Sequence, residues 1–425
     1  MIRAALVLLL TLVADLASAQ TNRIDLVRPD APELAAFGAF GIGVRTLVVV
    51  DKDRPDVVTT LAREVDILGG EPVPMYDRSL TVEVWYPANL PPSLTQRTQY
   101  VTTTPDPEVL ATLTGRAVRD ATASDQGPFP LVILSHGSPG NRYLMSHLGE
   151  NLASKGYVVV SVDHTDNTYE NHQGFRGTLY NRAPDQRAVL DAVAVWTEDA
   201  DHFLSGVADA NNTAIIGYSM GGYGALNNLG AGYSQAAASS RPPPIRDLLG
   251  DLMADSPGYR RSLDSRIRAG IPIAPWGMRQ GFWDAEALEG ITVPTLFVAG
   301  DADPVVGYAD GVRAVYHGAI NSERYLLVFK NAGHNPGAKI PEPLELWDAV
   351  DAEGASYYRA DPVWEHVRMN NILQHFVTAF LDLHLKGVEQ MRGYLDVPGD
   401  GAAAGPDGWP GFSRRGAVGL RMYGN

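Results

Sequence analysis

Short runs of mostly apolar residues alternate along the chain with longer amphipathic segments. Residues 130–135 and 157–162 are such runs, and they are typical of strands buried on both faces of a parallel sheet. Residues 367–385 instead repeat their apolar positions at helical spacing. This alternation predicts βαβ units, and hence an α/β fold with a mostly parallel central sheet and helices on both faces. The predicted strands are 41–51, 80–86, 130–135, 157–162, 295–299 and 325–329, and the predicted helices are 142–154, 182–197 and 367–385.

The same pattern indicates one large domain, residues 20–388, with three less regular excursions. The excursions lie near 89–127, 231–268 and 336–364. Gly387 ends the last predicted helix, as glycine commonly does. The Gly, Ala, Pro and Asp residues that follow predict a linker and a C-terminal tail at 389–425.

The N-terminus has the organisation of a secretory signal. Arg3 precedes an apolar stretch at 4–13, and the small residues 17–19 form a cleavage site before Gln20. The apolar stretch is too short to span a membrane. We therefore expect a signal peptide at 1–19 and an exported mature protein without a transmembrane segment, the alternative being a short buried helix.

Charge and cysteine usage exclude several classes of function. The formal net charge is −15 and the pI is about 5.1, which disfavours nucleic acid as a partner because that partner requires a cationic face. The chain has no cysteine, so neither disulfides nor thiolate chemistry can contribute.

The most informative stretch is residues 215–222, IIGYSMGG. An apolar strand, then G-x-S-x-G, then a helix is the context of a nucleophile elbow, in which a sharp turn exposes a serine hydroxyl. Gly217 and Gly221 remove the side chains that would collide across such a turn. The pattern predicts Ser219 as a nucleophile, against the alternative of an ordinary glycine-rich turn.

A serine nucleophile requires a base and an acid that orients the base. His334 follows a late apolar strand through an Ala-Gly step, and we predict it as the base. Asp301 and Asp303 follow the preceding strand, and either could be the acid. Each candidate comes just after the carboxyl end of a strand, where parallel α/β sheets place their chemistry.

Two backbone N–H groups are predicted to bind the oxyanion, those of Met220 and Ser138. His136 is interpreted as a structural residue that fixes its own turn. Residues 163–166, Asp-His-Thr-Asp, are interpreted as a hydrogen-bonded turn, because so few ligands rarely hold a metal alone.

The chain resembles the α/β-hydrolase superfamily, and within it the platelet-activating-factor acetylhydrolase (isoform II) and dienelactone-hydrolase-like group. The resemblance covers roughly 41–387. It is carried by the residues 84–88, 134–137, 152–159, 163–164 and 217–222. It implies the α/β-hydrolase fold and serine-dependent ester hydrolysis, with neither cofactor nor metal.

The resemblance fails at one position. Ala274 stands where the acetylhydrolases have their catalytic aspartate, and alanine cannot accept a hydrogen bond from histidine. In the wider superfamily a G-x-x-D turn after the next strand carries the acid, and Asp303 matches its last position. The resemblance therefore favours Asp303, with Asp301 bonding the turn's backbone.

We expect an exported carboxylesterase that acts on short to medium acyl esters. Small-molecule, phospholipid and polymeric (cutinase-type) esters are all compatible with the group. Trp276 and Trp347 are predicted to contact substrate, with the excursion near 336–364 forming a lid or wall, or merely packing on the surface. The alternatives are an acyltransferase, a peptidase or an inactive hydrolase-like binding protein, and the last is disfavoured because every triad residue type is present.

Overall fold

The computed structural model describes residues 21–62, 73–91, 97–106, 108–173, 175–239, 250, 252–347, 361–397, 399–403, 405 and 408–424. The signal peptide expected at 1–19 lies outside these residues. Among the helices of this described part, none has the length and apolar character that a membrane span requires.

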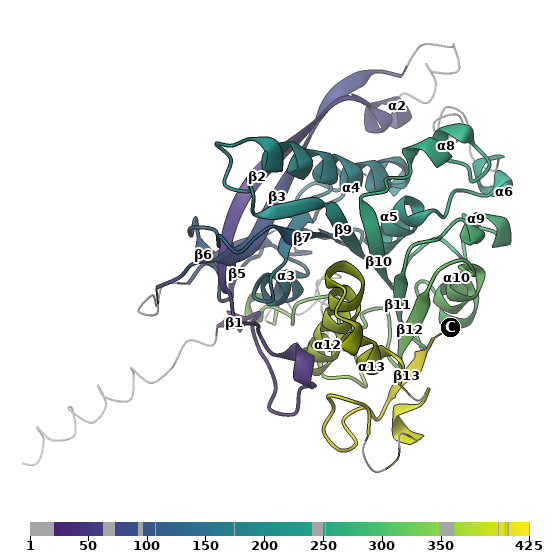
Figure 1. Ribbon diagram of the computed structural model, residues 1–425. Helices are drawn as coiled ribbons and strands as arrows, with labels where there is room; N and C mark the ends of the chain where they lie inside the picture. Colours follow the sequence, from purple (N-terminus) through teal and green to yellow (C-terminus); the bar gives the residue numbers. More distant parts are fainter. Residues whose placement is uncertain are drawn as a thin grey trace, which may run out of the picture.

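A sheet of ten strands runs through the centre of the described part of the chain (Figure 1). Its order is β13-β12-β11-β10-β9-β7-β8-β3-β2-β6. Neighbouring strands from β8 to β12 pair in parallel, whereas β3 is antiparallel to both β8 and β2. The prediction of a mostly parallel sheet is therefore confirmed. The strands are β2 (Gly41–Pro55), β3 (Met75–Ala88), β6 (Val118–Arg119), β7 (Phe129–Ser135), β8 (Val158–Val162), β9 (Ala208–Tyr218), β10 (Ile267–Ile273), β11 (Thr295–Gly300), β12 (Arg324–Phe329) and β13 (Leu420–Tyr423).

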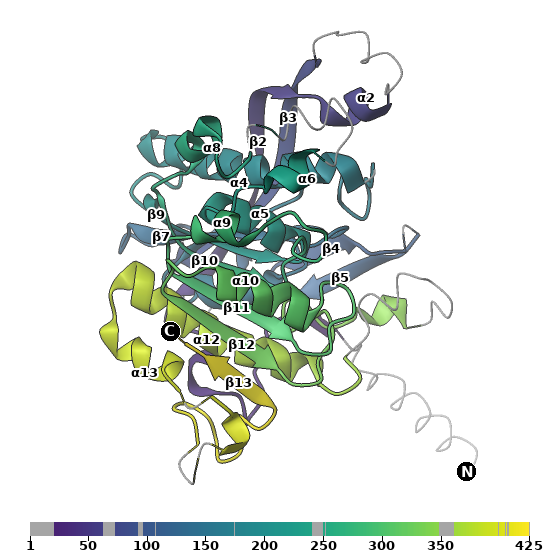
Figure 2. The ribbon, with the colours of Figure 1, turned by 90° about the vertical axis from the view of Figure 1, so that its right-hand side faces the viewer.

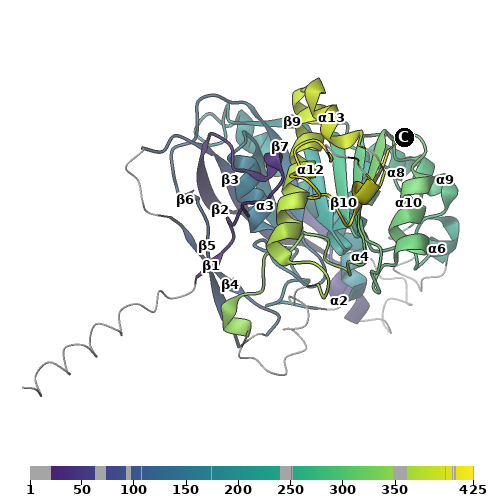
Figure 3. The same ribbon diagram turned by 90° about the horizontal axis from the view of Figure 1, so that it is seen from below.

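Helices cover both faces of this sheet (Figures 1 and 3). On one face α3 packs on β8 and α12 packs on β9 and β10, while α4 and α5 pack on β7 and β9 from the other. The α-helices are α2 (Val57–Ala62), α3 (Ser146–Ala153), α4 (Phe175–Glu198), α5 (Met220–Leu229), α6 (Gln235–Ser239), α8 (Pro257–Ser262), α9 (Ala285–Glu289), α10 (Arg313–Gly318), α12 (His366–Lys386) and α13 (Arg392–Leu395). Single turns occur at η1 (Glu33–Ala35), η3 (Tyr308–Val312), η4 (Leu344–Leu346), η5 (Glu389–Met391) and η6 (Gly401–Ala403).

The central strands are buried because both faces are covered. Every residue of β8 and of β11 is buried, which is why these strands are apolar runs instead of alternating patterns. Because helices cover both faces of the parallel strands, only the ends of these strands are left uncovered. The polar residues that follow β7, β8, β9, β11 and β12 are therefore held at a common edge.

Two segments differ from the expectation of irregular structure. Within the first excursion, β4 (Gln99–Thr103) and β5 (Leu110–Thr114) form a hairpin that β1 (Asn22–Arg23) extends to three strands.

The predicted C-terminal tail is integrated into the central sheet. Its strand β13 pairs antiparallel with β12 (Figure 2), and Trp409 is buried with its ring 6.0 Å from that of Phe376 in α12. Without β13, β12 would be an exposed edge strand of the sheet. Leu420 and Met422 are the alternating apolar residues of β13 that are buried when it pairs with β12.

Several histidines are buried in the fold and held neutral. Burial lowers the pKa of His147, His164 and His375 to about 3, and that of His366 to about 4. His147 lies on α3, His164 follows β8, and His366 and His375 lie on α12. Folding therefore buries histidines in several parts of the structure. Because burial disfavours the protonated imidazole, the free energy of unfolding depends on pH.

We predict that stability falls as the pH decreases from 7.5 to 5. The folded pKa values lie below the unfolded value near 6.5, so the unfolded chain binds protons that the folded protein does not. The free energy of unfolding is therefore greatest above about pH 6.5 and decreases by up to about 1.4 kcal/mol per pH unit for each such histidine. Urea unfolding at several pH values measures this, and His147→Gln should show a shallower dependence. An equal midpoint at pH 7.5 and pH 5 would contradict the prediction.

Candidate active site

Ser219 lies in a sharp turn between β9 and α5, with φ 52° and ψ −112°. Positive φ is costly for a residue with a side chain, and it persists only where the surroundings enforce it. Here Ser219 N–H donates to Ile273 O at 2.9 Å, and Ser219 O accepts from Trp276 N–H at 3.1 Å. Both backbone groups of the serine are therefore fixed by β10 and the turn after it.

The glycines around Ser219 are required by close backbone contacts. A methyl group on Gly217 would collide with the carbonyl of Gly221, and one on Gly221 would collide with the carbonyl of Ser135 at the end of β7. A methyl group on Gly222 would lie 3.0 Å from Pro275. The elbow is thus in direct backbone contact with the strand ends on either side of it, which fixes where the serine hydroxyl lies.

His334 bridges Ser219 and an aspartate. Its Nε2 lies 3.0 Å from Ser219 Oγ, and its Nδ1 lies 2.8 Å from Asp303 Oδ2. With Nδ1 protonated toward the carboxylate, Nε2 can accept the hydroxyl proton of Ser219. The imidazole is half-buried, and its ring centre lies 5.3 Å from that of Tyr218. The structure thus brings together three residues that are far apart in the sequence.

The two candidate aspartates have different partners. Asp303 uses Oδ1 to accept from the N–H groups of Val305 and Val306, at 2.8 and 3.1 Å, which leaves Oδ2 for His334. Asp301 instead accepts from Asn331 N–H at 2.5 Å, the backbone role expected for it. Geometry therefore favours Asp303 as the residue that orients His334.

The two predicted oxyanion donors lie on turns that touch each other. Met220 is the first residue of α5, so its N–H has no acceptor within the helix. Ser138 follows β7, whose last carbonyl contacts the elbow at Gly221. Ser138 Oγ accepts from Asn167 Nδ2 at 3.0 Å, so its side chain faces the turn after β8.

A second Ser-His-Asp line is buried behind this edge. His164 Nε2 lies 2.8 Å from Ser135 Oγ, and His164 Nδ1 lies 3.0 Å from Asp185 Oδ2. All three side chains are buried, and Asp185 also binds Arg54 and Arg78 at 2.6 and 2.8 Å. Substrate has no access to this array, so its role is structural.

The interpretations of His136 and of residues 163–166 are confirmed by their contacts. His136 Nδ1–H donates to Gly137 O at 2.7 Å, and its Nε2 accepts from His164 N–H. Burial, followed by the charge of Arg182, holds the pKa of His136 well below its usual value. In the turn after β8, Asn167 N–H donates to His164 O at 2.9 Å, and Asp163 accepts from Arg142 N–H at 2.6 Å.

A residue with an aromatic side chain is bonded to the backbone of the nucleophile. Trp276 bonds Ser219 through its backbone, and its half-buried ring is 4.9 Å from the ring of Phe175, the first residue of α4. Phe175 is partly exposed, and the sequence did not predict it as a site residue. Trp347, in contrast, has 64% of its surface exposed and makes no hydrogen bond or ring contact with another predicted site residue. Its role stays a prediction, and residues 348–360 of the same excursion lie outside the described chain.

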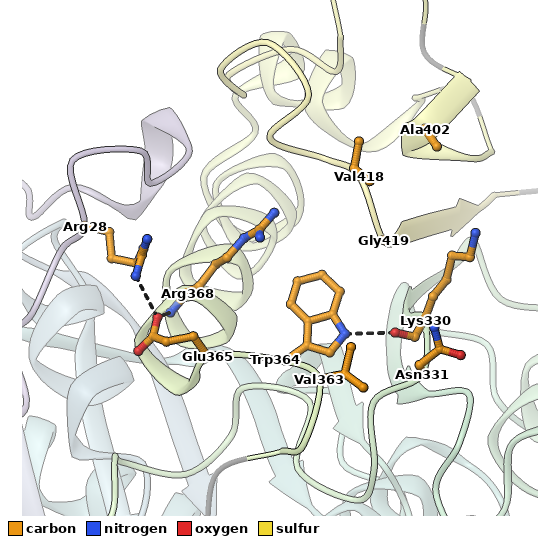
Figure 4. Close-up of a pocket in the computed structure, with 10 residues that line it drawn as sticks. All are labelled: Arg28, Lys330, Asn331, Val363, Trp364, Glu365, Arg368, Ala402, Val418 and Gly419. Atoms are coloured by element: carbon orange, nitrogen blue, oxygen red, sulfur yellow. Dashed lines mark hydrogen bonds and ion pairs between the residues drawn. The ribbon is translucent and has the colours of Figure 1, made fainter.

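The loop that carries His334 is anchored from behind. Asp361 Oδ2 accepts from Gly333 N–H at 2.5 Å, and Trp364 Nε1 donates to Lys330 O at 2.9 Å. A pocket of about 410 Å³ adjoins this anchor, lined in part by Arg28, Lys330, Trp364 and Arg368 (Figure 4). None of Ser219, Asp303 and His334 lines it.

Comparison with known proteins shows which proteins the chain is similar to. The family described as "Platelet-activating factor acetylhydrolase, isoform II" matches residues 84–198. A solved structure of a ferulic acid esterase from Streptomyces cinnamoneus superposes with a TM-score of 0.55 at 22% identity, covering 84% of this chain and 94% of the esterase. The chain has the α/β-hydrolase fold, and it is similar to the matched family over residues 84–198. The predicted fold class is thereby confirmed.

Curated proteins with named functions are similar to this chain at low identity. Cutinase est1 of Thermobifida alba is 26% identical over 211 residues, which is 49% of this chain and 55% of the cutinase. The bis(hydroxyethyl) terephthalate hydrolase of Streptomyces coelicolor is 26% identical over 221 residues, 52% of this chain and 55% of that enzyme. The chain thus spans about half the length of these relatives.

We predict that Asp303→Asn lowers kcat on p-nitrophenyl acetate by about ten-thousand-fold, because an amide at this position favours the wrong imidazole tautomer. Asp301→Asn is the matched control, and it should cost mainly thermal stability, since its carboxylate bonds backbone. Steady-state kinetics and melting curves of both variants measure this. The reverse pattern in kcat would make Asp301 the acid.

Proposed function

We propose that this protein is a serine-dependent carboxylic ester hydrolase that works through an acyl-enzyme. The observation that carries the proposal is the hydrogen-bonded line from Ser219 Oγ through His334 to Asp303, with distances of 3.0 and 2.8 Å. Of the three, Asp303 is the most deeply buried, while His334 remains half-buried at the carboxyl edge of the sheet. This arrangement supplies a nucleophile, a base and an orienting acid.

The reaction proceeds in two acyl transfers. Ser219 Oγ attacks the ester carbonyl carbon while its proton passes to His334 Nε2, and the N–H groups of Met220 and Ser138 bind the oxyanion. The intermediate collapses, and the departing alkoxide takes the proton from His334. Water then attacks the acyl-enzyme, again losing a proton to His334, and the second collapse releases the acid and restores the Ser219 hydroxyl. Asp303 stabilises the imidazolium in both halves.

The surroundings of Ser219 support esters with apolar or aromatic groups near the carbonyl. Trp276, whose backbone N–H bonds Ser219 O, packs its ring edge to face on that of Phe175, and such rings favour stacking or apolar contact. We propose short to medium acyl esters as the substrate class. Polyester hydrolysis is the second candidate, because relatives are named cutinase and terephthalate-ester hydrolase. Phospholipid acetyl esters are less favoured, since Ala274 replaces the acetylhydrolase aspartate.

Export is part of the proposal. It rests on the signal-like order of residues 1–19. N-terminal sequencing of exported protein tests it, with Gln20 as the expected first residue and Met1 as the contradicting one.

We predict that Ser219→Ala lowers turnover of p-nitrophenyl butyrate by about a million-fold without changing the melting temperature, because it removes the nucleophile but no packing. Ser135→Ala is the matched control: it shortens the serine of the buried Ser-His-Asp line and should keep at least a tenth of the activity. A Ser219→Ala protein that keeps a tenth of the wild-type rate would exclude Ser219 as nucleophile.

The same assay extends to the substrate class. Wild-type protein should have a higher kcat/KM on p-nitrophenyl butyrate than on emulsified long-chain triglyceride. Release of soluble aromatic acid from a polyester film would favour the second candidate function, whereas preference for the triglyceride would contradict the proposed class.

A further inference from the structure

The turn that carries Ser138 is held by a buried arginine from α4. Arg182 Nη1 donates to His136 O at 2.9 Å, and Nη2 lies 3.5 Å from Gly137 O. Nη2 also donates to Asn167 Oδ1. The side chain is 1% exposed. A guanidinium suits this position because its planar fork can bind several acceptors in fixed directions.

The carbonyl of Gly137 belongs to the same peptide group as the N–H of Ser138. Whatever orients that carbonyl therefore orients the predicted oxyanion donor as well, because the peptide is planar. A cation on the carbonyl side also polarises the group, which makes its N–H a stronger donor. Arg182 can thus act on the oxyanion donor without touching a substrate.

Asn167 holds the same turn from the side of β8. Its Nδ2 donates to Ser138 Oγ at 3.0 Å while its Oδ1 accepts from Arg182. Asn167 is buried. The arginine and the asparagine therefore fix both the backbone and the side chain of the turn.

Helix α4 also contacts the other half of the oxyanion site. Gln186, one helical turn after Arg182, donates to Gly221 O at 3.0 Å. A methyl group on Gly224 in α5 would come within 2.6 Å of Arg182 Cγ and 2.7 Å of Gln186 Nε2. The two helices are in close contact at this level, so α4 helps to set the spacing between the turn of Ser138 and the start of α5 at Met220.

We propose that Arg182, together with Asn167, is a positioning residue for the oxyanion site, holding the Ser138 N–H where it can bind the charge that develops during acyl transfer. This inference rests on the proposed function. It assigns a role to a residue of α4 that reaches neither Ser219 nor His334.

The test compares Arg182→Lys with Arg187→Lys. Lysine keeps the charge but cannot bind the His136 and Gly137 carbonyls and Asn167 together. Arg187 is the matched control, because it lies on the same helix and bonds Asn228 Oδ1 of α5 at 2.6 Å, away from the turn. Arg182→Lys should lower kcat on p-nitrophenyl butyrate by about ten- to a hundred-fold, the scale of a misplaced oxyanion donor, with KM changed less than threefold. Arg187→Lys should keep kcat within twofold.

A transition-state analogue separates positioning from general loosening. The Ki of an aryl trifluoromethyl ketone, whose tetrahedral adduct carries an oxyanion, should rise in Arg182→Lys by the same factor as kcat/KM falls. Unchanged kcat and Ki in a folded Arg182→Lys would overturn the inference, as would equal losses in both variants that follow their melting temperatures. If Arg182→Lys does not fold, Asn167→Ala tests the same turn with the same correlation between Ki and kcat/KM. Wild-type turnover and its loss in Ser219→Ala test the proposed function separately from these comparisons.

Discussion

The constraint on which the site depends is the backbone of the turn at Ser219. The serine can take positive φ because Gly217 and Gly221 have no side chains, and because β10 and the turn after it bind its backbone N–H and carbonyl. That contact brings three strand ends against one another. The loop of His334 is anchored separately from behind, so the 3.0 Å distance from Ser219 Oγ to His334 Nε2 depends on where this turn holds the serine.

Polar groups buried beside the turn explain how the strain is maintained. Asp185 is paired with Arg54 and Arg78 and bonded to His164, and Arg182 binds the carbonyls after β7. Burying such charges stabilises little by itself, but a satisfied network admits few alternative arrangements. The network therefore rigidifies the carboxyl edge of the sheet, where the position of Ser219 has to be fixed. His164, the neutral histidine of this network, links this rigidity to pH.

The sequence predicted those parts of the molecule that depend on local pattern. Buried strands are apolar runs, and the elbow is a contiguous motif, so β7, β8, β9, β11, β12 and Ser219 could be placed without coordinates. His334 could be predicted because it follows a late strand, after the serine and the candidate acids in the chain. Arg182, Phe175 and β13 were not, because each acts through a partner distant in sequence: carbonyls after β7, the ring of Trp276 and the free edge of β12. The choice between Asp301 and Asp303 needed a resemblance, whereas their contacts distinguish them directly.

The central claim is that one tight turn presents a nucleophile and an oxyanion site at the same edge of the sheet. A crystal structure of the protein after reaction with an alkyl fluorophosphonate tests it most directly. The account predicts a covalent bond from Ser219 Oγ to phosphorus, with the phosphonyl oxygen within about 3 Å of the N–H groups of Met220 and Ser138. An adduct on another residue, or a phosphonyl oxygen that faces solvent, would contradict it.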